Sequence, residues 1–448
     1  MPKKKTALTI EERLQQALVP AEEQPYEVPE NWVWVRLGAV CYASKEKSND
    51  FSNEIKYIGL EHLEKDKGIV GFSSADKVKS TKNAFQEGQI LYGRLRPYLN
   101  KHDIASFSGV CSTDILVLEA SVLVANVLVD KFFNLPFFIE YVVANSKGIN
   151  LPRVSEKTIL NTTFPLPPLS EQQRIVERIE ELFAKLDEAK ERLQEVANSF
   201  AVRKAAILHK AFTGELTKQW RRENGVSDES WEEKKLGEVC SVNPRKIDAK
   251  NLDDNLEVSF IPMAAVSDVL GEIVNPEVKN LEDVRTGFTN FAEGDVIFAK
   301  ITPCMENGKS AVVGPLLNDI GYGSTEFYVL RCKEELYNKY LYHMVRNTTF
   351  RAEAKAVMTG AVGQQRVPKT FLQEYQLLLP TIPEQHEIVR LIDDLLARER
   401  SAQQAAEQAL ASIDLMKKSI LARAFRGELG TNKASEASAL ELLRQVLS

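Results

Sequence analysis

The sequence lacks any apolar run long enough to cross a membrane. No stretch of its 448 residues approaches the roughly 18 apolar residues that a spanning helix needs. Residues 1–10 carry basic side chains, but no apolar segment follows them as it would in a secretory signal. We therefore expect a protein that neither spans a membrane nor is secreted.

Cysteine is scarce and scattered. The five cysteines are widely spaced, with no Cys-x-x-Cys pair: Cys41, Cys111, Cys240, Cys304 and Cys332. An odd number of isolated cysteines supplies no disulfide framework and is typical of a protein of the reducing cytoplasm. We therefore expect a cytoplasmic protein.

Motifs for catalysis are also missing. The Gly-Lys-Ser segment at 308–310 resembles the end of a phosphate-binding loop, but Pro303 stands where the first glycine belongs. No dinucleotide-binding or nucleophile-elbow pattern occurs, and Asn-Pro-Arg at 243–245 lacks the aromatic residue of the amino-methyltransferase motif. The five histidines are too dispersed to suggest a metal site. We expect no catalytic or metal-binding residues, and a recognition protein is favoured over an enzyme with an unfamiliar active site.

A surplus of positive charge is absent as well. The formal net charge is −6. Residues 30–165 hold 16 Lys and Arg against 15 Asp and Glu, and residues 231–378 hold 17 against 21, so the balances are +1 and −4. Domains that bind nucleic acid are usually basic, so these values argue weakly against DNA, although a local basic surface suffices.

What the sequence does contain is one unit present twice. The pattern Trp-x4-Leu-Gly at 32–38 recurs at 231–237, an offset of 199. Further matches follow in the same order at offsets of 206, 212 and 213: Phe85-x-Glu87-Gly88 with Phe291-x-Glu293-Gly294, Ser112-Thr113-Asp114 with Ser324-Thr325-Glu326, and Arg153-Val154 with Arg366-Val367. Several collinear matches indicate a duplicated chain.

The offset between the halves changes only in their first parts. From residues 166–176 and their counterparts 379–389 onward it stays at 213, up to 212–216 and 425–429. Loops that differ in length lie at a surface, whereas a segment that tolerates no insertion is length-critical. We therefore expect two variable globular domains, each followed by a spacer of fixed length.

Each constant-offset segment carries an apolar seam with heptad spacing. The seam positions are Ile175, Ile179, Leu182, Leu186, Ala189, Leu193, Val196 and Phe200 in the first copy, and Ile388, Ile392, Leu395, Glu399, Ala402, Ala406, Ala409 and Ile413 in the second. The seam predicts two long helices that pack on each other, large residues of one against alanines of the other. The alternative is that each helix lies on its own domain.

The helix ends are also marked. A proline-rich stretch precedes each helix, Ser170 is expected to be the N-cap of the first, and Gly214 and Gly427 are expected to end the two helices. A helix over residues 171–209 would span about 58 Å at about 1.5 Å per residue. That length exceeds one DNA turn of about 34–36 Å.

The first parts of the two halves mix short apolar runs with turn signals. Runs at 89–92, 115–118, 296–299 and 327–330 predict strands. Segments 125–144 and 337–356 predict helices, the first broken at Pro136. Two globular domains of the α+β class are therefore expected.

A basic segment follows the first predicted strand in each half. Pro97 makes the first of these loops rigid, and arginine and lysine on a rigid loop can hold phosphates or pair with guanine. Surface ion pairs are the alternative role for such cations. The candidate DNA contacts are Arg94, Arg96, Tyr98, Lys101 and Arg153 in the first half, and Lys300, Lys309 and Arg366 in the second.

The ordered set of motifs resembles the specificity subunit of type I restriction-modification systems. The motifs are Val-Pro-Glu-x-Trp at 28–32, Leu-Tyr-x-Arg-x-Arg-Pro at 91–97, Pro-Pro-Leu-x-Glu-Gln at 167–172 and Ala-Phe-x-Gly-Glu-Leu at 211–216. With their repeats they cover residues 26–429, and the tail at 439–443 resembles the short helix that often closes such subunits. Thr302 and Cys304 depart from the pattern, because they stand where the first half has Arg96 and Tyr98.

The resemblance implies a subunit without catalysis of its own, in which two target recognition domains each read one half of a bipartite, interrupted DNA sequence. The two helical segments would pack as an antiparallel coiled coil that separates the domains, sets the gap and docks two methyltransferase subunits, which motor-nuclease subunits join. Such methyltransferases flip out the adenine that they modify. No cofactor is expected on this chain, whereas S-adenosylmethionine, ATP and Mg²⁺ are expected on the partners. A scaffold that binds only proteins is the alternative.

The repeat and the resemblance together predict the domain boundaries. They are an N-terminal extension at 1–29, recognition domains at 30–165 and 231–378, helical spacers at 166–218 and 379–430, a linker at 219–230 and a tail at 431–448.

Overall fold

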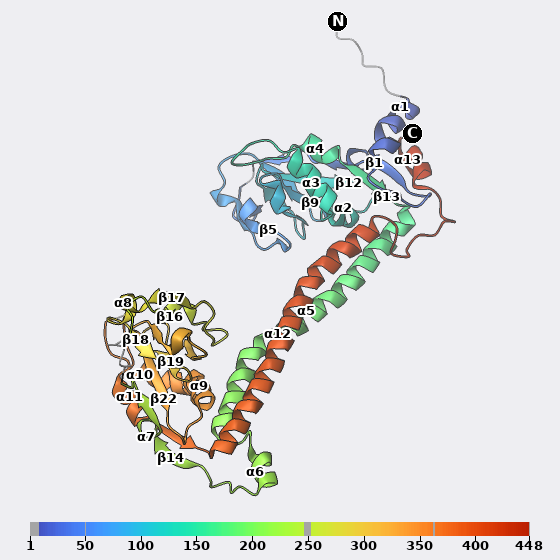
Figure 1. The fold of residues 1–448 in the computed structure, drawn as a ribbon. Coiled ribbons are helices and arrows are strands. Elements are labelled where there is room, and N and C mark those ends of the chain that lie inside the picture. Colours follow the sequence, from blue (N-terminus) through green and yellow to red (C-terminus); the bar gives the residue numbers. More distant parts are fainter. Residues whose placement is uncertain (1–8, 50, 246–251, 362, 448) are drawn as a thin grey trace. The chain divides into compact units, whose positions relative to one another are not determined.

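The computed structural model describes residues 9–49, 51–245, 252–361 and 363–447; the basic residues 1–8 of the predicted extension lie outside this part. The chain forms two compact units (Figure 1). Unit 1 comprises Met1–Leu193 and Gln408–Ser448, and unit 2 comprises Gln194–Glu407. Each unit therefore contains one globular domain together with part of each long helix. No helix in the described ranges is long and apolar enough to cross a membrane.

The globular domain of unit 1 is built on two sheets, with strand orders β10-β9-β12-β2 and β3-β8-β11-β4-β7. Two short pairs, β1–β13 and β5–β6, accompany them. The elements are α1 (Ile10–Ala17), β1 (Val33–Arg36), β2 (Cys41–Ala43), β3 (Lys47–Ser48), β4 (Lys56–Ile58), β5 (Leu63–Glu64), β6 (Gly68–Ile69), β7 (Ser73–Ser74), β8 (Lys82–Phe85), β9 (Ile90–Gly93), β10 (His102–Ile104), β11 (Gly109–Cys111), β12 (Ile115–Ala120), α2 (Asn126–Phe132), α3 (Pro136–Ala144), α4 (Glu156–Leu160) and β13 (Thr163–Leu166).

The globular domain of unit 2 also has two main sheets, with strand orders β15-β22-β19-β20 and β17-β16-β21-β18, and a short pair β14–β23. The elements are α6 (Lys218–Asn224), β14 (Glu232–Lys235), α7 (Leu236–Val239), β15 (Cys240–Val242), β16 (Glu257–Ile261), β17 (Glu277–Asn280), α8 (Leu281–Val284), β18 (Thr289–Phe291), β19 (Val296–Ala299), β20 (Ser310–Val312), β21 (Gly321–Gly323), β22 (Phe327–Cys332), α9 (Asn338–Arg346), α10 (Thr348–Ala356), α11 (Lys369–Glu374) and β23 (Gln376–Leu379).

The two domains share one topology. The order β2-β12-β9-β10 in the first corresponds to β15-β22-β19-β20 in the second. In each domain the other main sheet contains one parallel pair, β4 with β11 and β16 with β21. Parallel strands cannot be joined by a tight hairpin, so the same parallel pair in both domains is a specific shared feature. The duplication and the α+β class expected from the sequence are confirmed.

The cores lie where helices cover the first main sheet of each domain. In unit 1 the ring of Tyr92 on β9 packs against Phe133 and Phe138, with centroids 5.2 and 6.0 Å apart. In unit 2 the ring of Phe298 on β19 packs against Phe350 at 5.8 Å. Tyr92 and Phe298 are matched positions of the repeat, so the aromatic residue after the Phe-x-Glu-Gly motif is a core residue in both domains.

The predicted strands are all present, as parts of β9, β12, β19 and β22. The predicted break at Pro136 is confirmed, because α2 ends before it and α3 begins with it. The prediction of one helix over 337–356 was wrong. Asn347 adopts an extended backbone (ψ 141°) between α9 and α10, and its side chain accepts a hydrogen bond from the amide of Thr349 (3.0 Å). An asparagine that caps the next helix ends the preceding one.

The two heptad segments form α5 (Leu169–Phe212, 44 residues) and α12 (Ile382–Ala424, 43 residues). Ser170 is not the N-cap as predicted, because α5 already includes Leu169. The amide of Glu171 donates instead to the carbonyl of Pro168 (2.9 Å), so the proline supplies the first acceptor. At the other end of α12, Gly427 has φ of +74° and its amide donates to the carbonyl of Ala424 (3.2 Å), the arrangement that glycine permits after a helix.

The helices pack antiparallel within each unit. In unit 1, Asp187 pairs with Lys417 (2.5 Å) and Lys190 with Asp414 (3.2 Å). In unit 2, Arg203 pairs with Glu399 (2.8 Å). Because the residue numbers rise on one helix as they fall on the other, the two chain directions are opposed.

Burial varies along the predicted seam. Ile175, Ile179, Phe200, Ile388, Ile392, Ala406 and Ile413 are buried, whereas Leu182, Leu186, Ala189, Leu193, Leu395, Glu399 and Ala409 are half-buried, and Val196 and Ala402 are exposed. The first two seam residues of each helix belong to the core of the adjoining globular domain. The start of each helix therefore packs in one core with its own domain and with the end of the other helix. The short helix expected in the tail is also present, as α13 (Ala439–Leu447).

A buried Glu-Gln pair fixes the start of each long helix. In unit 1 the Gln172 amide group donates to the carbonyls of Leu123 (2.8 Å) and Pro167 (3.1 Å), which joins α5 to its domain. The Glu171 carboxylate accepts from the indole N–H of Trp32 (2.7 Å) and from two residues of the tail, Thr431 (3.0 Å) and Asn432 (2.8 Å). One fully buried carboxylate thus joins the domain, α5 and the C-terminal tail.

The equivalent pair in unit 2 is Glu384 and Gln385. Gln385 donates to the carbonyls of Glu335 and Pro380, both at 2.8 Å. Glu384 accepts from the Thr217 hydroxyl and from the Arg221 guanidinium, both at 2.6 Å. The Arg221 and Glu384 side chains are 6% and 0% exposed, so this is a buried ion pair.

Replacing Arg221 should test the importance of this pair. Arg221→Met leaves the Glu384 carboxylate buried without its cation, and loss of one partner of a buried pair destabilises proteins by roughly 3–5 kcal/mol. We expect such a decrease in the free energy of unfolding, measured by denaturant titration. Arg222→Met, at the exposed neighbouring position, is the control and should change it by less than about 0.5 kcal/mol. Equal small losses for both variants would contradict the assignment.

Candidate nucleic-acid interface

The loop after β9 is fixed by its backbone. The amides of Arg94 and Arg96 donate to the carbonyls of Asp114 (2.8 Å) and Pro152 (2.7 Å). Arg96 has a left-handed backbone (φ 54°), and the Nε of Arg94 donates to a neighbouring carbonyl at 3.3 Å. The side chains of Arg96 and Tyr98 are exposed, Tyr98 by 49%, and neither forms a hydrogen bond or ion pair with the described residues. These two side chains are therefore available to a ligand.

Two of the candidate lysines instead hold the sheets of their domains together. The ammonium of Lys101 donates to the carbonyl of Leu60 (2.9 Å), and that of Lys309 donates to the carbonyl of Met263 (3.1 Å). Leu60 follows β4 and Met263 follows β16, so the two contacts are equivalent in the two domains. Both ammonium groups already have an acceptor within the protein.

The matched arginines form a repeated ion pair. Arg153 pairs with Asp114 (2.5 Å), and Arg366 pairs with Glu326 through two nitrogens (2.7 and 2.9 Å). The sequence showed both ends of this pair as separate repeats, the Ser-Thr-acid motif and the Arg-Val motif, but gave no sign that they meet. The positive charge of each arginine is thus largely balanced inside its own domain.

The second domain presents a different loop. Lys300 lies over the ring of Tyr328, with its nitrogen 5.2 Å from the centroid. Thr302 and Cys304 provide no cation where the first domain has Arg96 and Tyr98. The two domains therefore share the ion pair and the bridging lysine but differ in the side chains that they expose.

Buried thiols offer no reactive nucleophile. Burial raises the pKa of Cys41, Cys111 and Cys332 to about 12, and it raises that of Cys240 as well. A thiol with such a pKa is protonated at neutral pH and reacts poorly. No group of three or more potential metal ligands is found among the described residues.

The sequence analysis missed one group of cations. Lys204 on α5, Arg346 on α9, Arg351 on α10 and Arg400 on α12 line one cavity of unit 2. They are far apart in the sequence and form no motif. A comparison of the two helices at the offset of 213 would have revealed part of the group, because Arg400 stands where the first copy has Asp187.

Comparison with known proteins gives a consistent assignment. A family model described as the type I restriction modification DNA specificity domain matches twice, over residues 29–198 and 228–409. The specificity subunit of the type I restriction enzyme EcoEI from Escherichia coli is 32% identical over 260 residues, 49% of this chain and 43% of the relative. That of EcoAI is 37% identical over 187 residues, 42% of this chain and 31% of the relative. The matched part thus spans less than half of these relatives' own length.

Solved structures share the fold. The HsdS subunit from Thermoanaerobacter tengcongensis superposes with a TM-score of 0.67 at 22% identity, covering 91% of this chain and 99% of that one. A specificity subunit from Methanocaldococcus jannaschii, that of MjaVIII, is 25% identical over 409 residues, 85% of this chain and 91% of the relative. Similarity therefore extends over both halves of the chain.

The repeated ion pair should make stability depend on pH. The hydrogen bond from Arg366 lowers the pKa of Glu326. The contribution of the ion pair to the free energy of unfolding is therefore fully present above the ordinary glutamate pKa of about 4.3. It is lost as the pH falls through the lower pKa of Glu326 in the folded state. Glu326→Gln should lower the Tm at pH 7, and its difference in Tm from wild type should shrink as the pH falls below the ordinary glutamate pKa. The control is Glu334→Gln, at an exposed position. A difference in Tm that stays constant with pH would argue against a stabilising ion pair between Arg366 and Glu326.

Proposed function

Because the chain belongs to the type I restriction-modification DNA specificity family, we propose that it recognises a bipartite DNA sequence, each globular domain reading one half. The observation that carries this proposal is the double match of the family model, one copy in each half. The two domains share a topology but differ in loop length and in exposed side chains. Such differences suit two unlike half-sites.

Reading by the first domain would use its rigid exposed loop. Arg96 and Tyr98 extend from a backbone that is hydrogen-bonded at several points. An arginine held in this way can pair with guanine or with a phosphate. Arg153, Lys101, Lys309 and Arg366 would act mainly by holding the loops in place, because each has a partner in the protein.

The paired helices would set the distance between half-sites and would carry partner subunits. Helices of 44 and 43 residues have lengths of about 65 Å at 1.5 Å per residue. That length is enough to address half-sites about one DNA turn apart. The chain itself would supply sequence recognition. Two methyltransferase subunits using S-adenosylmethionine, and motor-nuclease subunits using ATP and Mg²⁺, would supply the chemistry.

Mapping of modified adenines is the direct test. The chain would be expressed with its methyltransferase subunit in a host that lacks other adenine methylation, followed by sequencing that detects methylated adenine. We expect methylation at a motif of two short parts separated by an unspecified gap. A continuous motif would contradict the proposal that two domains each recognise one half-site. Complete absence of sequence preference in DNA binding would favour a scaffold that binds only proteins.

Shortening the helix pair should change the gap. Because Asp187 faces Lys417 and Lys190 faces Asp414, residues 186–192 and 412–418 form facing heptads. Deleting both keeps the seam in phase and removes about 10 Å, or about three base pairs. We expect the half-sites to keep their sequences while the gap shortens. A double substitution in the same region at exposed positions, Lys185→Ala with Arg192→Ala, should leave the gap unchanged. An active deletion variant with the original gap would refute the role of the helices.

A further inference from the structure

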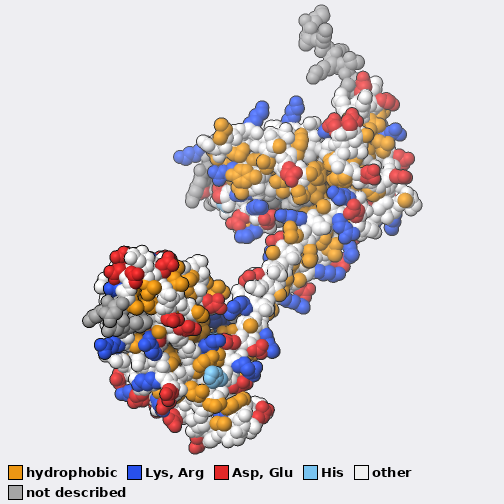
Figure 2. Space-filling view, in the orientation of Figure 1, with side chains coloured by type: hydrophobic (Ala, Val, Ile, Leu, Met, Phe, Trp, Pro, Cys, Tyr) orange, Lys and Arg blue, Asp and Glu red, His pale blue; other side chains and the backbone are white. Residues whose placement is uncertain are grey.

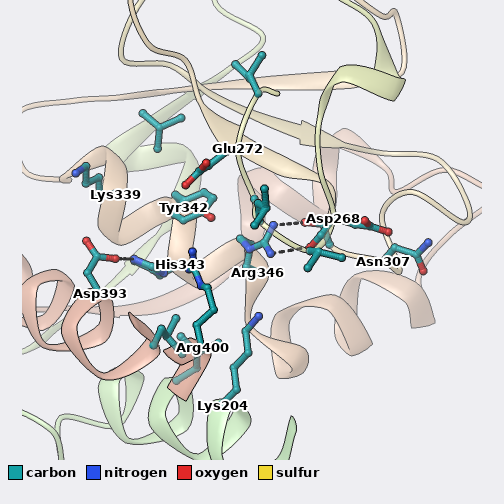
Figure 3. Close-up of a pocket in the computed structure, with 18 of the residues that line it drawn as sticks. Lys204, Asp268, Glu272, Asn307, Lys339, Tyr342, His343, Arg346, Asp393 and Arg400 are labelled. Carbon is teal, nitrogen blue, oxygen red and sulfur yellow. Dashed lines mark hydrogen bonds and ion pairs between the residues drawn. The ribbon is translucent and has the colours of Figure 1, made fainter. Parts of the chain in front are cut away.

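Unit 2 contains a cavity of about 1160 Å³ between its globular domain and the adjoining stretches of α5 and α12. Figure 2 shows Lys and Arg side chains in this region. In Figure 3, Lys204 from α5, Arg346 from α9 and Arg400 from α12 extend toward the same space, and Tyr342 forms part of the wall. Arg351 of α10 also lines the cavity, which therefore brings together cations from four helices.

These cations lack acidic partners. The Arg346 guanidinium donates to the backbone carbonyls of Gly308 and Asp268, both at 2.8 Å, so its contacts are uncharged. Arg351 donates to a backbone carbonyl, and its Nε is buried with no partner among the described residues. Lys204 and Arg400 form no hydrogen bond or ion pair with the described part of the chain. None of these four cations forms an ion pair with an acidic side chain among the described residues.

Four carboxylates also line the cavity, those of Asp268, Glu272, Asp393 and Glu399. Glu399 pairs with Arg203 (2.8 Å). Asp393 pairs with His343 (3.0 Å), and Arg400 contributes to lowering the pKa of Asp393, so this carboxylate offsets part of the positive charge. Asp268 and Glu272 belong to the loop between β16 and β17, and Asp268 contacts Arg346 through its backbone oxygen only. Figure 3 places Glu272 beside Tyr342, on the side away from Lys204.

The electrostatic state of Lys204 reflects this crowding. Its side chain keeps contact with solvent through the open side of the cavity, but burial by the walls lowers its pKa, and Arg346, Arg351 and Arg400 lower it further. Burial and the nearby Arg346 lower the pKa of Arg351 in the same way. Like charges held together in this way disfavour one another, and a bound anion would relieve that repulsion.

Unit 1 provides an internal comparison. At the offset of 213, Lys204 corresponds to Lys417 and Arg400 corresponds to Asp187. In unit 1 this lysine and this aspartate form an ion pair at 2.5 Å. In unit 2 arginine stands in place of this aspartate. The two matched residues therefore carry no net charge in unit 1, as Lys417 and Asp187, and two positive charges in unit 2, as Lys204 and Arg400. The cation cluster is thus particular to the second half.

We propose that this cavity is a phosphate-binding site that takes a backbone phosphate of the DNA strand beside the half-site read by the second domain. The inference rests on the proposed function. The planar guanidinium group of arginine suits phosphate oxygens, and these arginines form no ion pair with an acid among the described residues. The cavity is too small for a duplex and admits only the edge of a strand. The second domain has a balance of −4, so the helices supply the positive charge that DNA at this domain requires.

The salt dependence of DNA binding tests this inference. Affinity of the complex with its methyltransferase subunit for its mapped target would be measured by fluorescence anisotropy over a range of KCl. Each lost phosphate contact reduces the slope of log K against log salt by about one. We expect a reduction of about one in the slope for Lys204→Gln and for Arg400→Gln. For Arg400→Asp we expect a reduction of about two, because the new aspartate would pair with Lys204 as Asp187 pairs with Lys417. The preference for target over unrelated DNA should stay the same, because phosphates carry no base identity.

The matched control is Lys417→Gln, which removes the same charge at the equivalent position of unit 1, where Asp187 already balances it. Its slope should equal that of wild type. If Lys204→Gln and Lys417→Gln behave alike while the wild-type complex binds its target, the inference is overturned and the proposed function stands. If the wild-type complex binds no DNA, both fail.

A second readout separates bound DNA from a free phosphate compound. Inorganic pyrophosphate should raise the Tm of the full chain, and Arg400→Asp should abolish this shift. If pyrophosphate behaves in this way but the DNA slopes do not change, the cavity takes a small phosphate compound and its assignment to the DNA strand is overturned.

Discussion

The buried carboxylate at the start of each long helix constrains everything around it. A charge removed from water is strongly destabilising unless donors surround it, so Glu171 and Glu384 require their partners to be present together. The donors to Glu171 come from the domain and from the tail after α12, and the donors to Glu384 come from the segment after α5. The neighbouring Gln172 and Gln385 donate to carbonyls of the domain, so in each unit a globular domain, the start of one helix and the chain after the end of the other meet at this point.

The two units meet this requirement with different residues. In unit 2 the donors are Thr217 and Arg221, from the chain between the two halves. In unit 1 they are Trp32 and the tail residues Thr431 and Asn432. The tail thus performs in unit 1 the role that the connecting segment performs in unit 2. Aligning the two halves of the sequence does not reveal this shared role, because the donors in the tail and in the connecting segment do not lie at matched positions of the repeat.

Periodicity and repetition predicted much of the fold, whereas pairings between distant side chains escaped prediction. The heptad seam, the strand runs and the break at Pro136 are local patterns, so the sequence alone reveals them. Asn347 divides a helix because its side chain caps the next one, and Ser170 lost the cap because the Pro168 carbonyl supplied an acceptor. Within the candidate interface, the sequence identified Arg153 and Arg366 but not their acidic partners. Such contacts depend on tertiary placement and leave no signal in spacing.

Constant length and variable charge are separate properties of the two helices. Between the halves, α5 and α12 differ by substitution and not by insertion, so the exchange of Asp187 for Arg400 changes charge without changing the number of residues in the helix. Net charge is therefore a poor guide to partners in this chain. A domain with a balance of −4 lies beside helices that carry Lys204 and Arg400. A duplicated protein of this design can adapt each half separately, because a surface substitution on a helix alters what that half holds and leaves the length of the helix pair untouched.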